Sequence, residues 1–145
     1  MQQLAPFIGE WSVDAVFPGA PPGPGVPART TFEWLFDGRY VLQRAEIELA
    51  EAPDVLAVIR PDPASGGYVQ HYFDSRGVVR EYAMTFDGRV WTLRRDAPDA
   101  SPLDFRQCFT GTFEDDARTI RGPWERTGDD GEWLHDFDLI YAKVG

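Results

Sequence analysis

Cysteine and lysine each occur only once in this sequence of 145 residues, as Cys108 and Lys143. A single cysteine excludes a disulfide within the chain, which fits a reducing compartment. The first residues, Met1 to Pro6, have neither the basic start nor the apolar core of a signal peptide. No apolar run approaches the roughly 20 residues that span a bilayer. We therefore expect a cytoplasmic protein without membrane contact.

Positive charge is also scarce, because 14 lysine and arginine residues stand against 24 aspartate and glutamate residues, for a net charge of -10. Binding to nucleic acid or to an anionic membrane needs a basic patch, so neither is an expected partner. Every basic residue except Lys143 is arginine, and this bias, with many Ala, Gly, Pro and Asp residues, is typical of a GC-rich bacterial genome.

Motifs for metal binding and catalysis are missing. The sequence has no C-x-x-C or H-x-x-x-H pair, and no serine lies in a nucleophile elbow. The acidic runs Glu114-Asp115-Asp116 and Asp129-Asp130 are typical of solvated hairpin tips. We expect no metal, no resident cofactor and no enzymatic activity. A small hydrolase or isomerase remains an alternative, which would need a titratable group in a deep polar pocket.

No run is long enough for a substantial helix, and the chain reads instead as about ten short strands joined by tight turns. Asp-Gly pairs mark two hairpins, at Phe36-Asp37-Gly38-Arg39 and Phe86-Asp87-Gly88-Arg89. A helical turn is expected at Gln2–Ile8. The expected strands are Glu10–Val16, Thr30–Leu35, Tyr40–Leu49, Val55–Arg60, Tyr68–Phe73, Val78–Thr85, Val90–Arg95, Phe105–Phe113, Thr119–Arg126 and Trp133–Lys143.

Such a meander of strands leaves no room for the helices that parallel crossovers require. It therefore predicts an all-β fold, a ten-stranded antiparallel up-and-down barrel, as a single domain over residues 1–145. The segment Pro18–Pro27, rich in proline and glycine, is expected to be a long loop. Two interpretations of this loop stay open, a lid over one mouth of the barrel or a surface loop without such a role.

Gly9-Glu10-Trp11 resembles the G-x-W signature at the first strand of the lipocalin (calycin) superfamily. With the order of strands and the closing stretch Trp133–Tyr141, the chain most resembles an uncharacterised bacterial lipocalin-like family, and more distantly the nitrobindins and fatty-acid-binding proteins. The resemblance implies a barrel with an interior cavity and the tryptophan packed across its closed end. In secreted lipocalins an arginine of the last strand stacks on that tryptophan, whereas this chain has only Lys143 there.

Alternate residues of each barrel strand face inward, and we assign this phase to the more aromatic or apolar set. On the last strand this assignment places Trp133, His135, Phe137, Leu139 and Tyr141 inside. A few polar groups among aromatic side chains are typical of a small-molecule site. The predicted ligand-binding residues are Trp34, Tyr72, Tyr82, Met84, Trp91, Arg95, Gln107, Phe109 and His135.

Arg95 carries the strongest functional expectation, because a buried guanidinium is costly unless it is paired. If it faces inward it needs a carboxylate such as Glu33 or an acidic ligand, and otherwise its head lies in water at the rim. Cys108 is expected on the outer face as an inert thiol. The face of His71 is left open by the pattern.

The sequence predicts binding of a small hydrophobic or amphipathic molecule inside the barrel. One alternative is a barrel that binds haem or nitric oxide with His135 as the proximal ligand, since a neutral imidazole is a common iron ligand. Another is a barrel packed solid with side chains, acting through a homodimer or another protein contact.

Overall fold

The computed structural model describes residues 1–19, 28–47, 53–100 and 102–145. Its strands form one closed antiparallel barrel in which each strand pairs with its sequence neighbours and the last pairs with the first. The elements are η1 (Gln2–Phe7), a 3-10 helix, and β1 (Gly9–Val16), β2 (Ala28–Leu35), β3 (Tyr40–Ile47), β4 (Val55–Pro61), β5 (Tyr68–Asp74), β6 (Val79–Phe86), β7 (Val90–Arg95), β8 (Gln107–Phe113), β9 (Thr119–Thr127) and β10 (Trp133–Lys143).

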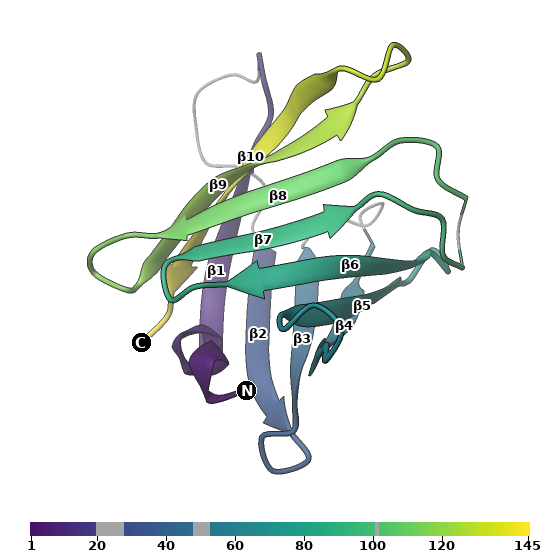
Figure 1. The fold of residues 1–145 in the computed structure, drawn as a ribbon. Helices are drawn as coiled ribbons and strands as arrows, with labels where there is room; N and C mark the ends of the chain where they lie inside the picture. Colours follow the sequence, from purple (N-terminus) through teal and green to yellow (C-terminus); the bar gives the residue numbers. More distant parts are fainter. Residues whose placement is uncertain (20–27, 48–52, 101) are drawn as a thin grey trace.

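This architecture confirms the predicted all-β, ten-stranded antiparallel barrel with a short N-terminal helical turn. In Figure 1 β1 to β3 run from top to bottom while β6 to β8 run across the view, so the strands of the two halves cross. The barrel closes between β1 and β10, where Trp11 lies opposite Lys143 and Val16 opposite Asp138. No helix of the described residues is long and apolar enough to cross a membrane.

The predicted strand limits differ from the observed ones mainly at β8, which begins at Gln107 and not at Phe105. The expected lid segment falls largely on residues 20–27, and the expected end of the third strand on residues 48 and 49. Both lie outside the described residues. The two Asp-Gly hairpins are confirmed, because β2 pairs with β3 and β6 pairs with β7. In their turns Gly38 has a φ of 82° and Gly88 a φ of 102°, values that glycine tolerates best.

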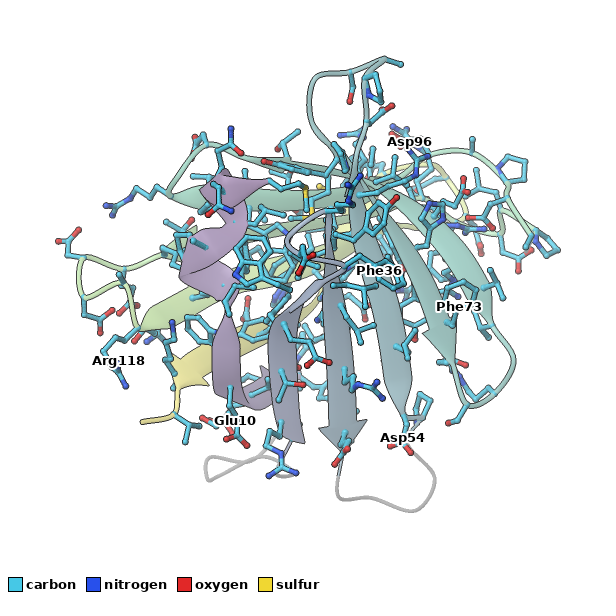
Figure 2. The ribbon with its side chains drawn as sticks, turned by 90° about the horizontal axis from the view of Figure 1, so that it is seen from below. Glu10, Phe36, Asp54, Phe73, Asp96 and Arg118 are labelled. Carbon is cyan, nitrogen blue, oxygen red and sulfur yellow. The ribbon has the colours of Figure 1, made fainter. Side chains whose placement is uncertain are left out.

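The helix η1 closes one end of the barrel with an aromatic cluster. Phe7, the last residue of η1, is 1% exposed and its ring lies 5.3 Å from Phe32, 4.8 Å from Phe86 and 5.0 Å from Trp91. Figure 2, seen from below, shows η1 in the foreground beside β1 and β2. Burying a phenylalanine stabilises the fold by roughly 2–3 kcal/mol. The packing of Phe7, more than the few hydrogen bonds within so short a helix, therefore holds η1 in place.

Trp11 fixes the same closed end. Its indole Nε1 donates a hydrogen bond to the backbone oxygen of Phe7 at 2.8 Å, and the Nζ of Lys143 lies 5.3 Å from its ring centroid. Gly9 accommodates this arrangement, since its φ is 133° and a Cβ there would lie 3.1 Å from the Cε of Lys143. The cation of the last strand therefore covers the tryptophan of the first.

Candidate functional site at the open end of the barrel

The barrel interior has two ends that differ in their side chains. We call the half under η1 the closed end; its inward residues Phe7, Trp11 and Trp91 are 0–1% exposed. The opposite half, toward the β5–β6 turn and the β7–β8 connection, is the open end. There the outermost inward residues, such as Tyr72 and Arg80, are only partly buried. Among the described residues, the inward side chains at the open end are therefore less completely buried than those at the closed end.

Small side chains line one wall of the open end. The inward positions of β2, β3 and β4 include Ala28, Ala45 and Ala57. A hollow of about 360 Å³ lies at this edge of the sheet, and it is lined by residues of both faces, among them Ala45 and Val55 of the inward phase and the exposed Arg44 and Phe73 of the outer one. Below this edge two amides pair, because Gln70 Nε2 donates to Gln43 Oε1 at 2.8 Å, and both residues are at least nine-tenths buried. This wall therefore combines small apolar side chains with a buried amide pair whose two side chains hydrogen-bond to each other.

Large side chains form the facing wall. Trp124 of β9 lies 5.3 Å from the ring of Phe109 on β8 and 5.7 Å from that of Tyr82 on β6. Phe109 is fully buried, whereas Trp124 and Leu139 are partly exposed. The aromatic wall is therefore only partly covered by other side chains of the protein, and its indole surface faces the open end.

The predicted ligand-binding residues are divided between the two ends. Tyr72, Tyr82, Gln107 and Phe109 do come together at the open end. Three others, Trp34, Met84 and Trp91, pack in the closed end, where Met84 and Trp91 are 1% exposed. Their strand phase was predicted correctly, but they lie along the strands nearer to η1. They form the core under the site and not its accessible surface.

The expectation that His135 faces the interior is wrong. A β-bulge between His135 and Phe137 shifts the register of β10, so that Phe137 lies opposite Trp124 while His135 lies opposite Glu125. Phe137, Leu139 and Tyr141 keep the inward phase, whereas His135 is exposed and its Nε2 lies 3.2 Å from Asp138 Oδ1. The same bulge leaves Trp133 on the outer face.

Arg95 is buried and paired, although not as expected. Its guanidinium is 3% exposed, and Nε and Nη2 donate to the two carboxylate oxygens of Asp99 at 3.0 and 3.1 Å. The hydrogen bonds that Arg95 donates to Asp99 are the main cause that raises the pKa of Arg95. The suggested partner Glu33 lies instead 3.7 Å from Arg44. Asp99, in the connection between β7 and β8, is therefore the carboxylate that neutralises the buried charge of Arg95.

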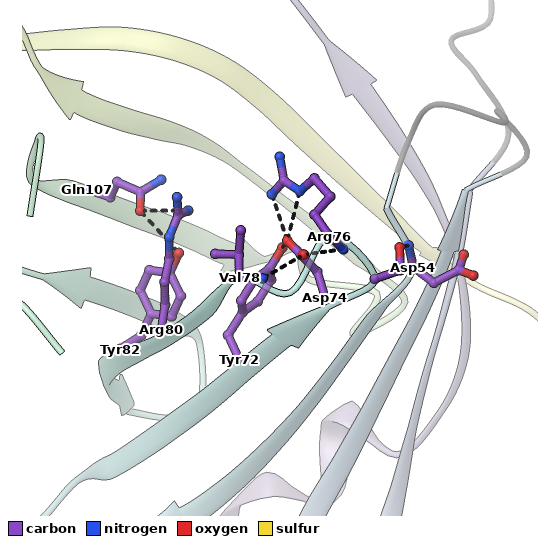
Figure 3. A network of polar contacts seen from close by, with 9 residues as sticks. Asp54, Tyr72, Asp74, Arg76, Val78, Arg80, Tyr82 and Gln107 are labelled. Carbon is purple, nitrogen blue, oxygen red and sulfur yellow. Dashed lines mark hydrogen bonds and ion pairs between the residues drawn. The ribbon is translucent and has the colours of Figure 1, made fainter. Parts of the chain in front are cut away.

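A second saturated carboxylate, Asp74, lies at the end of β5. Its side chain is fully buried; Oδ2 accepts from the Tyr72 hydroxyl at 2.8 Å and from Arg76 Nη2 at 2.7 Å, and Oδ1 accepts from two backbone amides (Figure 3). Burial by itself raises the pKa of Asp74, but these hydrogen bonds outweigh it and lower the pKa to about 2. Burial likewise raises the pKa of Tyr72. This cluster holds the β5–β6 turn in place.

Sequence reasoning missed Arg80. It lies opposite Tyr72 on the inward phase of β6, and its Nη1 is 3.4 Å from Gln107 Oε1. The hydroxyl of Tyr82 donates to the same oxygen at 3.2 Å, so both side chains converge on Gln107 (Figure 3). Its Nε is buried without a partner, and within the described residues no carboxylate lies at ion-pair distance from Arg80. Continuing the alternation of Met84 and Tyr82 by one more step would have identified it.

The remaining candidates lie outside the barrel interior. His71 accepts a hydrogen bond from Arg60 Nε at 3.0 Å and lies 3.4 Å from Glu81, in a row on the outer face. Cys108 is partly buried opposite Arg94. In the part of the chain that the structure describes, no group of three His, Cys, Asp or Glu side chains is placed to hold a metal ion.

Comparison with known proteins adds no relative to these observations, since no family model matches the sequence and no curated protein matches it.

Proposed function

We propose that the open end of the barrel binds a small, largely apolar or amphipathic molecule. The observation that carries this proposal is the contrast between the two ends: the closed end is filled by buried aromatic rings, whereas Trp124, Tyr72 and Leu139 at the open end stay partly exposed beside polar groups. An apolar concave surface with a few oriented polar groups is the usual composition of a small-molecule site.

Affinity would come mainly from the aromatic wall. Covering the faces of Trp124 and Tyr72 removes apolar surface from water at roughly 25 cal/mol per Å², before the entropy of association is subtracted. The hydroxyl groups supply direction more than affinity. Because burial raises the pKa of both Tyr72 and Tyr82, each phenol is neutral at physiological pH. Each phenol already donates its proton, to Asp74 and to Gln107 respectively, so the hydroxyl oxygens are what can accept a hydrogen bond from a ligand.

We further propose that the barrel is calycin-like. This is supported by the fully buried Trp11 of Gly9-Glu10-Trp11 at the closed end and by Lys143 of the last strand above its ring. In this position lysine supplies the cation that secreted lipocalins supply with arginine. We propose a binding role in the cytoplasm and no catalysis. Haem is not part of the proposal, because the exposed His135 was the residue on which it depended.

Native mass spectrometry of freshly purified protein, compared with its denatured mass, tests the binding role. We expect an extra non-covalent mass of a few hundred daltons. In a Trp124→Ala variant, a smaller fraction of the protein should carry this mass. A matched Trp133→Ala variant removes an indole from the outer face and should keep the extra mass. Bare protein from every preparation, combined with no binding of any added amphiphile, would contradict the proposal.

The same spectra test the alternative of a protein contact. Exposed apolar side chains gather near the β1 and β10 strands, where Phe17 is 54% and Leu134 46% exposed and the ring of Phe17 lies 5.1 Å from that of Phe137. A homodimer that buries them would appear at twice the chain mass, and a Leu134→Asp variant would return it to the monomer.

A further inference from the structure

Two strand edges at the open end differ in what covers them. β6 begins at Val79, whereas its pairing with β7 begins only at Ala83. The β7–β8 connection covers this edge, because Asp99 Oδ2 accepts hydrogen bonds from the backbone N–H of Glu81 at 2.7 Å and from Arg95 Nε at 3.0 Å. A buried side chain of the connection therefore takes the place of a strand partner at the edge of β6.

The corresponding part of β10 has no such cover. Its pairing with β1 ends where Asp138 lies opposite Val16, whereas its pairing with β9 continues to Trp133. Within residues 1–19, 28–47, 53–100 and 102–145, no strand pairs with Trp133–Asp136 on the β1 side, and no loop donates a backbone hydrogen bond to it. Figure 1 shows this end of the β9–β10 hairpin projecting at the top of the barrel. We call Trp133–Asp136 the free edge.

The backbone groups that the free edge presents follow from the ladder between β9 and β10. Gly128 N donates to Glu132 O at 2.9 Å, so these two residues form a hydrogen-bonded pair. In an antiparallel ladder such pairs alternate with pairs whose N–H and C=O groups point away from each other. Leu134 therefore bonds to β9, whereas Trp133 and His135 direct their N–H and C=O groups to the free side. Unpaired groups in such a row are a template for another strand.

Exposed apolar side chains accompany these backbone groups. Leu134 is 46% exposed and Trp133 is 36% exposed. The guanidinium groups of Arg94 and Arg106 lie 5.5 and 5.1 Å from the centroid of the Trp133 ring, and both donate through Nε to Asp96. These contacts hold the indole in one place before a partner arrives. Tryptophan is among the most frequent anchor residues of protein interfaces.

The charges beside the free edge favour a basic partner. The acidic side chains of the β9–β10 turn and of the following strand are Asp129, Asp130, Glu132, Asp136 and Asp138. Among the side chains that the structure describes, the first three form no ion pair, whereas Asp136 lies 3.9 Å from Arg126 and Asp138 lies 3.2 Å from His135. Lysine or arginine side chains on an added strand would complement these carboxylates.

The same charges disfavour a second copy of the chain. If two free edges paired antiparallel about Leu134, Glu132 of one copy would lie opposite Asp136 of the other. Like charges directly opposite each other destabilise a strand pair. Both copies would also carry the net charge of -10.

We propose that the free edge binds an extended, basic peptide segment of another protein, which joins the barrel as an additional strand. Trp133 and His135 supply the backbone hydrogen bonds, and Leu134 with the Trp133 ring contacts the apolar side chains of the segment. In this mode of recognition the main-chain hydrogen bonds give affinity and the side-chain contacts give specificity. This role is independent of the molecule proposed for the barrel interior.

Amide hydrogen exchange, followed by NMR spectroscopy on the native protein, tests this proposal. The probe is a capped octapeptide of alternating valine and lysine residues, and its control has glutamate in place of lysine. At a saturating concentration of the lysine peptide, exchange at Trp133 and His135 should slow about tenfold or more, while Leu134, already bonded to β9, should change by less than about twofold. The glutamate peptide should bind about tenfold or more weakly than the lysine peptide.

Two matched pairs of variants separate backbone pairing from charge. Trp133→Pro removes an N–H of the free edge but no bond to β9, so it should weaken binding about tenfold more than Trp133→Ala, which removes only the indole. The double variant Asp129→Asn and Glu132→Gln should weaken binding of the lysine peptide about fivefold. Its control, Glu114→Gln with Asp115→Asn, removes two charges from the β8–β9 turn and should leave the affinity within about twofold. Thermal melting checks that each variant is folded.

Three results would overturn the proposal. Unchanged exchange at Trp133 and His135 in millimolar lysine peptide would show that the free edge accepts no strand. Equal affinity for the two peptides would exclude a basic segment as the preferred partner. Sedimentation velocity detects self-pairing, and a dimer in which the same two amides are protected would show that a second copy occupies the edge.

Discussion

The two ends of the barrel interior each contain a tryptophan, and the two side chains have different surroundings. Trp91 at the closed end is 1% exposed, and rings of Phe7, Phe109 and Tyr141 surround it at 5.0 to 5.7 Å. Trp124 at the open end touches Phe109 and Tyr82 and stays partly exposed. The same residue type is therefore completely packed at one end and keeps an accessible surface at the other.

The two ends also differ in their unpaired donors. Among the side chains that the structure describes, each end contains one buried nitrogen without a hydrogen-bond partner, Trp91 Nε1 at the closed end and Arg80 Nε at the open end. The indole nitrogen lies among packed rings, where burial of the large side chain outweighs the unpaired donor. The guanidinium nitrogen belongs to a charged and partly exposed side chain. The two unpaired donors therefore differ in the charge and the exposure of the side chains that carry them.

The largest expected difference between the ends comes from truncating the two tryptophans. Trp91→Ala should lower the free energy of unfolding by about 4 kcal/mol, because a fully buried aromatic leaves a cavity. Trp124→Ala should lower the free energy of unfolding by about half as much. In addition, it should weaken the binding of an added amphiphile such as octanoate, which Trp91→Ala should not do directly. Urea unfolding and calorimetry measure the two effects. Equal destabilisation by both changes would remove the distinction between the ends.

Breaking the Arg95–Asp99 pair should have the next largest effect. Asp99→Asn leaves a buried guanidinium, 3% exposed, without its counter-ion, and should destabilise the protein by about 3 kcal/mol. The exposed pair of Arg89 and Asp115 provides the control, since Asp115→Asn should change stability by less than about 1 kcal/mol. A small effect of Asp99→Asn in urea unfolding would show that the β7–β8 connection is not held by this pair.

Acid should act on the open end before the closed end, because Asp74 lies there. Its pKa is lowered from 3.8 to about 2 in the folded protein, so it contributes about 2 kcal/mol above pH ~4, which is lost as the pH falls through about 2. Unfolding of the Asp74→Asn variant should accordingly depend less on pH between about 4 and 2 than that of the native protein. Parallel pH profiles for the two proteins would contradict this assignment.

The smallest effect should come from Lys143 at the closed end. Lys143→Gln removes the cation above Trp11 and should lower stability by roughly 0.5–1 kcal/mol, whereas Lys143→Arg should restore it. Thermal melts in low and high salt measure this difference. Under the proposed function, the affinity for an added amphiphile should be the same in all three proteins, since the proposed site lies at the other end of the barrel.

The fold could be predicted from the sequence because alternation and turn chemistry are local signals. Asp-Gly at residues 37–38 and 87–88 marked two hairpins, and the inward phase of β8, with Phe109 and Phe113 buried, followed from alternation alone. Packing against Gly111 does not follow from alternation: the ring of Phe109 lies over this glycine, and a Cβ on Gly111 would lie 2.7 Å from that ring.

The site could be predicted less well, because its details depend on contacts that alternation does not encode. The bulge at Asp136 turns His135 outward, and no glycine or other turn residue in the sequence there indicates a bulge. Asp99 reaches Arg95 from a connection without any periodic pattern. Arg80 continues the inward alternation of Tyr82 and Met84, but a charged residue interrupts the apolar pattern by which the inward phase is recognised.

Indole NMR spectroscopy of the ¹⁵N-tryptophan-labelled protein tests the contrast between the ends most directly. Each indole resonance can be assigned from a Trp→Phe variant, and octanoate is then titrated into the native protein. We expect the Trp124 resonance to shift while those of Trp11 and Trp91 stay in place. Shifts confined to Trp11 and Trp91, or no shift at Trp124 at a saturating octanoate concentration, would contradict it.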